Sequence, residues 1–317
     1  MILKYIILTL IGFYLLIKGA DLFVDGIAST SANLKIPKLI ISLSIVAFGT
    51  STPELFISFK SLLNGNNDIV MANVVGSTIV NTMLIIGVSS LIKPIRIKNE
   101  TIKKQLPLHL MIILFFSILF LDKMFNNTIN TLSRSDAIIL FIIFLSFVIY
   151  IYKYAKSQNK EAIKETPKWN LPKSIIFGII GLVGISIGSD IAVNNCVNIA
   201  TYLHVSQKII TMMILVLGTS MPELIMAINS VKKGEYDIIM GNIIGTNIFN
   251  IGFVLTLPVI IFGGFSTNNF NFIDMFIMII SGLTIYIFAK DDRKLDKFEG
   301  LVMITIFIIY YGYMILM

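Results

Sequence analysis

The stretch GTSTPE at residues 49–54 places three hydroxyl side chains, a proline and a carboxylate inside an otherwise apolar run. It occurs a second time as GTSMPE at residues 218–223, which is 169 positions later. The same offset aligns the residues that follow without a gap, so that Asn81 matches Asn250. Because a long polar duplication in one register indicates an internal repeat, the sequence predicts two copies of one structural unit, each with one acidic residue at an equivalent place.

The composition is that of a chain surrounded by lipid. Hydrophobic residues make up 56% of the 317 residues, charged residues make up 14%, and the mean hydropathy is +0.87. A soluble fold could not bury that much apolar surface. The single cysteine, Cys196, excludes a disulfide framework. The net charge of +7 comes from lysines between apolar segments, so no nucleic-acid partner is predicted.

Ten segments are apolar and long enough to cross a bilayer, for which a helix needs roughly 20 residues. Five precede the middle of the chain and five follow it, which predicts an all-α polytopic membrane protein of two five-helix repeats. An odd number of spans per repeat gives the two copies inverted topologies. The predicted spans are near residues 2–20, 38–62, 69–92, 106–122, 134–152, 174–192, 207–231, 238–262, 270–289 and 298–316.

The predicted division of the chain is a first repeat at 1–152, a polar linker at 153–173 and a second repeat at 174–317. If both termini lie outside, 19 of the 25 basic residues fall in inner loops. The positive-inside rule therefore predicts outside termini, a cytoplasmic linker and a multi-pass protein of the cell membrane. Residues 19–21 match residues 188–190 in mid-chain, so the first segment is expected to be a permanent helix rather than a signal peptide.

The proline of each motif predicts a break in its helix. Pro53 has no amide hydrogen, so the Gly49 carbonyl loses its usual helical partner, and Pro222 does the same to Gly218. In hydrocarbon an unpaired carbonyl costs several kcal/mol, so a break is tolerated only where it faces protein, water or an ion. A bound cation would satisfy the freed carbonyls.

The side chains around the two motifs supply oxygen ligands. Glu54 and Glu223 carry the charge, the motifs add hydroxyls, and the helices that follow add the amides of Asn81 and Asn250. Calcium takes 6–8 oxygen ligands and sodium accepts the hydroxyl and carbonyl subset, but two carboxylates would equally balance two protons. Because intramembrane carboxylates are expensive and usually functional, we interpret the pair as a cation site rather than as part of a structural kink.

Four further acids repeat at the same offset. Asp68 and Asp237 precede predicted helices and are interpreted as N-caps. Asp21 and Asp190 lie near predicted helix ends, where an interfacial role and a site role are equally compatible with the sequence.

These motifs resemble those of the cation/calcium exchanger superfamily, in particular the sodium/calcium exchanger branch of the prokaryotic ten-helix type. The resemblance covers nearly the whole chain, with signature regions at 39–84 and 208–253. It implies a secondary active antiporter that exchanges calcium for sodium by alternating access at a midplane site, with the first and sixth helices sliding across the remaining bundle. The predicted partners are calcium, sodium and the lipid bilayer, with no cofactor and no obligate protein partner.

The resemblance also implies a ligand set. Glu54 and Glu223 would be the central calcium ligands, completed by Asn81 and Asn250, while hydroxyls and backbone carbonyls would line flanking sodium sites. The predicted metal positions are Glu54, Glu223, Thr50, Thr219, Ser51, Ser220, Asn81, Asn250, Ser77, Thr246, Ala47 and Val216.

Two alternatives stay open. Asn250 stands where several relatives carry Asp, which argues against potassium co-transport. Proton/calcium relatives usually carry a carboxylate where Asn81 and Asn250 stand, so antiport of calcium against protons is the second candidate. A cation channel is a weaker one. An enzyme is not expected, because no His or Cys lies near the polar cluster in the sequence.

Overall fold

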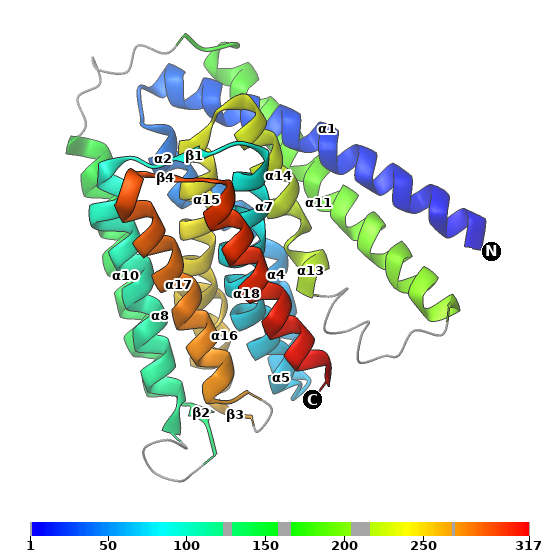
Figure 1. Ribbon diagram of the computed structural model, residues 1–317, viewed down its shortest axis with the longest axis vertical. Coiled ribbons are helices and arrows are strands. Elements are labelled where there is room, and N and C mark those ends of the chain that lie inside the picture. Colours follow the sequence, from blue (N-terminus) through cyan, green and yellow to red (C-terminus); the bar gives the residue numbers. More distant parts are fainter. Residues whose placement is uncertain (1, 123–128, 158–165, 204–215, 268–269, 317) are drawn as a thin grey trace.

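The computed structural model describes residues 2–122, 129–157, 166–203, 216–267 and 270–316. These residues are mostly helical, with one pair of long helices inclined against the remaining bundle (Figure 1). Three predicted features extend outside the described residues, namely part of the linker 153–173 and the first residues of the span 207–231 and of the signature 208–253.

The described residues of the first half form five helical rods; short π-helical turns interrupt the second and third rods, and another opens the fourth. Its elements are α1 (Ile2–Leu34), α2 (Lys38–Ile41), η1 (Ser42–Val46), α3 (Ala47–Thr50), α4 (Thr52–Leu63), α5 (Asn67–Met71), η2 (Ala72–Gly76), α6 (Ser77–Ile79), η3 (Val80–Ile85), α7 (Ile86–Ile92), β1 (Ile95–Arg96), η4 (Thr101–Gln105), α8 (Leu106–Phe120), β2 (Thr131–Leu132) and α10 (Arg134–Ser157).

The second half follows the same order. Its described elements are α11 (Leu171–Tyr202), α13 (Val216–Thr219), α14 (Met221–Lys233), α15 (Tyr236–Phe249), η7 (Asn250–Val254), α16 (Thr256–Phe262), β3 (Phe265–Ser266), α17 (Phe272–Asp292), β4 (Lys294–Leu295) and α18 (Lys297–Leu316).

The membrane-spanning pattern agrees with the sequence. Eight of the described helices are long and apolar enough to cross a membrane, and the bent pair Lys38–Thr50 and Thr52–Leu63 makes a ninth, with a bend of 42°. The tenth predicted span is described only from residue 216 onwards. Large apolar side chains are exposed along α1, α10 and α11, where lipid would cover them. The predicted all-α polytopic fold is confirmed.

The first and sixth helices are longer than predicted. α1 continues to Leu34 instead of ending near residue 20, and α11 covers 171–202 instead of 174–192. The prediction placed Asp21 near the end of the first span. In the structure Asp21 and Asp25 lie within α1 and form ion pairs with Lys233, at 3.4 Å and 2.7 Å. The helix therefore continues through these acids.

α1 and α11 run antiparallel with their backbones in contact. A Cβ added at Gly12 would lie 2.6 Å from the amide nitrogen of Ala192, and one at Gly19 would lie 2.7 Å from that of Ile185. Gly12, Gly19 and Gly26 are spaced by seven residues and therefore share one helix face. Small residues let membrane helices approach closely. We call this contact line the glycine seam, and it joins α1 and α11 into one two-helix unit.

Two short antiparallel strand pairs join the halves at opposite ends of the molecule (Figure 1). β1 pairs with β4 through Ile95 and Leu295, and β2 pairs with β3 through Leu132 and Phe265. The first pair joins two loops predicted to be inner, and the second joins two loops predicted to be outer. The contacts thus group the loops as the charge distribution predicts.

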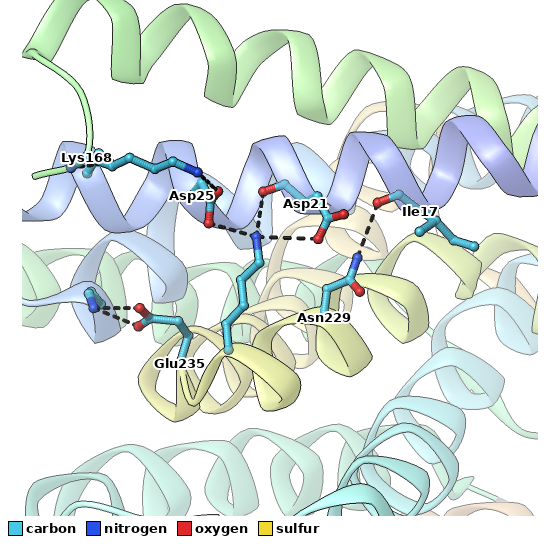
Figure 2. A network of polar contacts seen from close by, with 9 residues as sticks. Ile17, Asp21, Asp25, Lys168, Asn229 and Glu235 are labelled. Carbon is cyan, nitrogen blue, oxygen red and sulfur yellow. Dashed lines mark hydrogen bonds and ion pairs between the residues drawn. The ribbon is translucent and has the colours of Figure 1, made fainter.

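Ion pairs hold further predicted inner loops together (Figure 2). Lys38 pairs with Glu235 at 2.7 Å, which joins the start of α2 to the short connection between α14 and α15. Lys168, just before α11, pairs with Asp25 of α1 at 2.7 Å, and Lys233 at the end of α14 reaches the same carboxylate at 2.7 Å. We call the end of the molecule that carries these loops the basic end.

The acids near the starts of the third and eighth rods are not N-caps, so that prediction is wrong. Asp68 and Asp237 each lie second in their helices, after the N-cap and the first helical residue, and neither N-cap side chain forms a capping hydrogen bond. Asp68 accepts a hydrogen bond from the hydroxyl of Thr267, and Asp237 pairs with Lys98 at 2.5 Å. Both acids therefore tie one repeat to the other.

Candidate cation site

Each motif breaks its helix at the same point. In the first half α3 ends at Thr50 and α4 begins at Thr52, and in the second half α13 ends at Thr219 and α14 begins at Met221. The proline lies in the first turn of the new helix in both cases, where its missing amide hydrogen is tolerated. The glutamate of each motif follows in that turn, where the helix dipole favours a negative charge.

The two motif carboxylates are buried together in the interior. Glu54 and Glu223 are each 1% exposed. Glu54 Oε2 and both carboxylate oxygens of Glu223 have no hydrogen-bond partner among the described residues. Two buried acids without a basic partner form a site whose natural complement is positive charge.

Unpartnered polar atoms concentrate at the predicted positions. The described part of the chain has 15 buried side-chain nitrogen and oxygen atoms without a partner, and nine of them belong to the predicted ligand set. An unsatisfied buried polar atom is costly, so such a concentration fits a site that a cation completes. The nine atoms are Ser51 Oγ, Glu54 Oε2, Ser77 Oγ, Asn81 Oδ1, Ser220 Oγ, both Glu223 carboxylate oxygens, and Oδ1 and Nδ2 of Asn250.

The remaining predicted positions lie around this cluster with different exposure. Thr50, Thr246 and Ala47 are buried, whereas Thr219 is half-buried. The Ala47 carbonyl accepts hydrogen bonds from the Ser51 amide at 3.0 Å and from the Thr50 hydroxyl at 3.3 Å. Val216 is the first residue of α13, and its side chain lies outside the described part.

Each motif packs against the helices that carry Asn81 and Asn250, partly through contacts between the two halves. The Thr50 hydroxyl lies 3.3 Å from both Asn242 Oδ1 and the Thr246 hydroxyl. A Cβ at Gly245 would lie 2.7 Å from the Ala47 Cβ, so only glycine permits this approach of α15 to α3. Within the first half, Asn73 Nδ2 donates to the Glu54 carbonyl at 2.9 Å. Ligand candidates from both repeats therefore meet in one place.

π-helical turns were not predicted from the sequence. The spacing of Asn73, Ser77 and Asn81 predicts one continuous α-helical face, but η2 and η3 interrupt that helix at Ala72–Gly76 and Val80–Ile85. In the second half η7 begins at Asn250 itself. Such turns occur frequently at functional sites. These π-helical turns contain no residue type that predicts such a turn from the sequence.

A histidine lies behind the site, contrary to the sequence-based expectation that none is near. His109 of α8 is 1% exposed, and its Nε2 lies 3.0 Å from Nδ2 of Asn247. Asn247 in turn contacts Asn81. The expectation failed because His109 is 138 residues from Asn247 along the chain, so only the packing of α8 brings the two together.

The donor set suits a hard cation. No group of three or more His, Cys, Asp or Glu side chains that could hold a metal occurs among the described residues, so tight sites of the zinc type are absent there. The cluster instead combines two carboxylates with hydroxyl and amide oxygens, the ligands that calcium prefers and that sodium shares in part.

Comparison with known proteins gives a consistent result. The sequence model of the family described as "Sodium/calcium exchanger protein" matches residues 4–153 and 173–316. The putative antiporter CaxA of Alkalimonas amylolytica is 32% identical over 96% of each chain, and the inner membrane protein YrbG of Escherichia coli is 33% identical over 81% of this chain and 80% of its own. The sodium/calcium exchanger MaX1 of Methanosarcina acetivorans is 26% identical over 96% of each chain.

The fold has a close counterpart among solved structures. The sodium-calcium exchanger NCX_Mj, soaked with Na⁺ and Sr²⁺, superposes with a TM-score of 0.85 and 27% identity, over 98% of this chain and 99% of its own. The family model covers both halves of the chain, including both motifs and both asparagine helices. The chain therefore belongs to the sodium/calcium exchanger family.

Proposed function

We propose that the chain is a secondary active antiporter that exchanges calcium for sodium across the cell membrane, with alternating access to a single midplane site. The observation that carries this proposal is the pair of buried carboxylates, one at the helix break of each repeat, among unpartnered oxygens. Two negative charges balance one calcium ion, and several sodium ions can compete for the same oxygens. The sodium/calcium exchanger names of MaX1 and NCX_Mj support the choice of ions.

The proposed site is the predicted set of twelve positions. Glu54 and Glu223 hold calcium, with Asn81 and Asn250 beside them, and the motif hydroxyls and carbonyls take sodium. Exchange is coupled if the empty site, with two uncompensated charges, cannot cross between its two states. No cofactor takes part, no covalent chemistry occurs, and no second protein is required.

The proposed orientation places the basic end in the cytoplasm. Both termini are then outside, residues 153–173 form a cytoplasmic linker, and the repeats are residues 1–152 and 174–317. The strand pairs and ion pairs support this grouping of loops, and the positive-inside rule supplies the sidedness.

The experiment that tests the proposal is radioactive calcium uptake into proteoliposomes. One set is loaded with sodium, a second carries only an outward proton gradient, and a third has no gradient. We expect rapid uptake in the first set and none in the third. Glu54→Gln abolishes that uptake, whereas Glu100→Gln, which neutralises an exposed acid directly before η4, leaves it unchanged.

The outcomes separate the candidate functions. Uptake driven by protons but not by sodium would replace this proposal with proton/calcium antiport, which the two carboxylates would equally serve. Calcium flux without any gradient-dependent accumulation would point to a channel. Normal sodium-driven uptake by Glu54→Gln would refute the site while leaving the exchange activity in place.

A further inference from the structure

A chain of hydrogen bonds runs from α8 to the proposed site. Nε2 of His109 lies 3.0 Å from Nδ2 of Asn247 on α15, and the same nitrogen donates to the Thr82 hydroxyl at 2.9 Å. Asn247 Oδ1 accepts from Asn81 Nδ2 at 3.1 Å. All four side chains are at most 1% exposed. Water does not reach these groups from outside, so each one is oriented by its protein neighbours.

The chain of bonds determines which atom of Asn81 is left over. Asn247 donates from Nδ2 to two acceptors, so its Oδ1 must receive the Asn81 amide hydrogens. Asn81 Oδ1 is then the one polar atom of that side chain without a partner. If His109 donated from Nε2 instead, both amides would reverse and Asn81 would offer an NH₂ group there. An NH₂ group cannot ligate a cation.

The hydrogen-bond pattern also assigns the histidine tautomer. His109 Nε2 accepts from Asn247, so in the neutral ring the proton is on Nδ1, which has no partner among the described residues. The reversed pattern, in which Nε2 donates, would pair the same groups with both amides turned, so the tautomer of His109 and the orientation of the two amides are set together.

The second half lacks an equivalent arrangement. Asn250, the counterpart of Asn81, has no hydrogen-bond partner for either amide atom within the described structure. The position that corresponds to Asn247 in the first repeat is Thr78, whose hydroxyl donates to the Val74 carbonyl of its own helix at 2.8 Å. The internal repeat therefore does not account for His109, Asn247 and Thr82 as a group.

We propose that His109 is a positioning residue for calcium, which acts through Asn247 to hold the amide oxygen of Asn81 toward the bound cation. This inference rests on the proposed function of the site. His109 does not touch the ion. It selects the amide orientation in which Asn81 presents an oxygen, much as the hydrogen-bond partners of metal ligands orient those ligands in other proteins.

The test compares two substitutions of the same residue in the full chain. His109→Leu removes the acceptor, so both amides are free to reverse, whereas His109→Gln keeps an acceptor near the place of Nε2. Calcium binding is measured by titration calorimetry on the purified protein, and calcium uptake is measured in sodium-loaded proteoliposomes. Thr78→Val serves as the matched control, because its hydroxyl bonds only within its own helix.

We expect His109→Leu to weaken calcium binding about tenfold, the lower end of the range for losing a residue that hydrogen-bonds to a metal ligand. The half-saturating calcium concentration for uptake rises by the same factor, and the maximal rate at saturating calcium stays within about twofold, since the carboxylates are intact. His109→Gln recovers most of the affinity, and Thr78→Val matches the unaltered chain.

Two results would overturn the inference. The first is unchanged calcium affinity in His109→Leu, and the second is a lower maximal rate with an unchanged half-saturating concentration, which would indicate a role in packing or conformational change. If His109→Leu does not fold, His109→Gln decides alone: a tenfold or greater loss of calcium affinity in this variant, which keeps an acceptor, would also contradict the inference. Absence of calcium binding by the unaltered chain would overturn the proposed function, and this inference with it.

Discussion

The two repeats carry the same polar motifs, but the motifs make different contacts. Asn73 donates to the backbone and to Ser58 within its own repeat, whereas its counterpart Asn242 accepts from Thr50 of the other repeat and leaves its own Nδ2 unpartnered. The Asn81 side chain donates a hydrogen bond to Asn247, whereas neither amide atom of Asn250 has a hydrogen-bond partner among the described residues. Two equivalent halves in inequivalent arrangements are expected of an inverted-repeat transporter in one of its two states.

The ends of the molecule differ in the same way. At the basic end Lys233 ties α14 to Asp21 and Asp25 of α1. The positions that correspond through the repeat are Asn64 for Lys233 and Asn194 for Asp25, which leaves no charge pair to form. Among the described residues, Lys233 therefore ties the two-helix unit to α14 at the basic end without a counterpart at the other end. In the proposed exchange cycle, these pairs favour one of the two states.

The largest expected effect comes from the two motif glutamates, the residues in which the repeats are alike. Glu54→Gln and Glu223→Gln should each lower the initial rate of sodium-driven calcium uptake by more than roughly 100-fold, because losing a charged ligand costs more than losing a residue that only hydrogen-bonds to a ligand. Thermal unfolding should not occur at a lower temperature, since each change removes a buried charge without a basic partner. Near-normal uptake by one variant but not the other would show that the carboxylates are not equivalent.

The second largest effect is expected at the glycine seam between α1 and α11. Gly19→Val should destabilise the protein by about 1–3 kcal/mol and strongly reduce transport, since its side chain would press on the α11 backbone. Gly178→Ala is the control, because nothing lies within 4 Å of its added Cβ. Both are compared by thermal unfolding and calcium uptake. A Gly19→Val protein with unchanged stability would mean that α1 and α11 do not pack as closely as described.

Removing the side-chain amide of Asn81 or of Asn250 should affect calcium affinity to different extents. Asn81→Ala is expected to raise the half-saturating calcium concentration about tenfold, and Asn250→Ala by only a few-fold. The reason is that a pre-oriented oxygen loses less freedom on binding than an unheld one and so contributes more to affinity. Calcium titration of both variants checks this. Equal losses, or a greater loss in Asn250→Ala, would show that the asymmetry of the hydrogen bonds has no energetic consequence.

The smallest effect concerns the ion pairs at the basic end. Asp25→Asn weakens two of them, at Lys168 and Lys233, and partly exposed pairs are worth about 1 kcal/mol or less each. We expect a shift of a few-fold toward the state in which the basic end opens, seen as faster amide hydrogen exchange near the C-terminal end of α1. High salt should produce a similar change in the unaltered chain. Lys294→Met, which breaks an exposed pair with Asp292, is the control.

Most of the fold could be predicted from the sequence, but the site could be predicted only in part. The spans and the helix breaks at Pro53 and Pro222 follow from local composition and from a missing amide hydrogen. The length of α1 could not be predicted, because its acids look like a helix end until Lys168 and Lys233 pair with them. The N-cap assignment of Asp68 failed for the same reason, since its partner Thr267 is 199 residues away.

The sequence by itself determined the duplication, the membrane-spanning segments and the paired carboxylates, because these depend on residue type and on spacing along the chain. Only the tertiary structure decided which polar atoms are partnered. His109, Asn247 and Asn81 are joined by contacts between residues 138 and 166 positions apart, and nothing in the repeat indicates them. The repeat gives both halves the same polar motifs at the same spacing. Packing into a single conformation makes them unequal, because equivalent side chains such as Asn73 and Asn242 meet different neighbours.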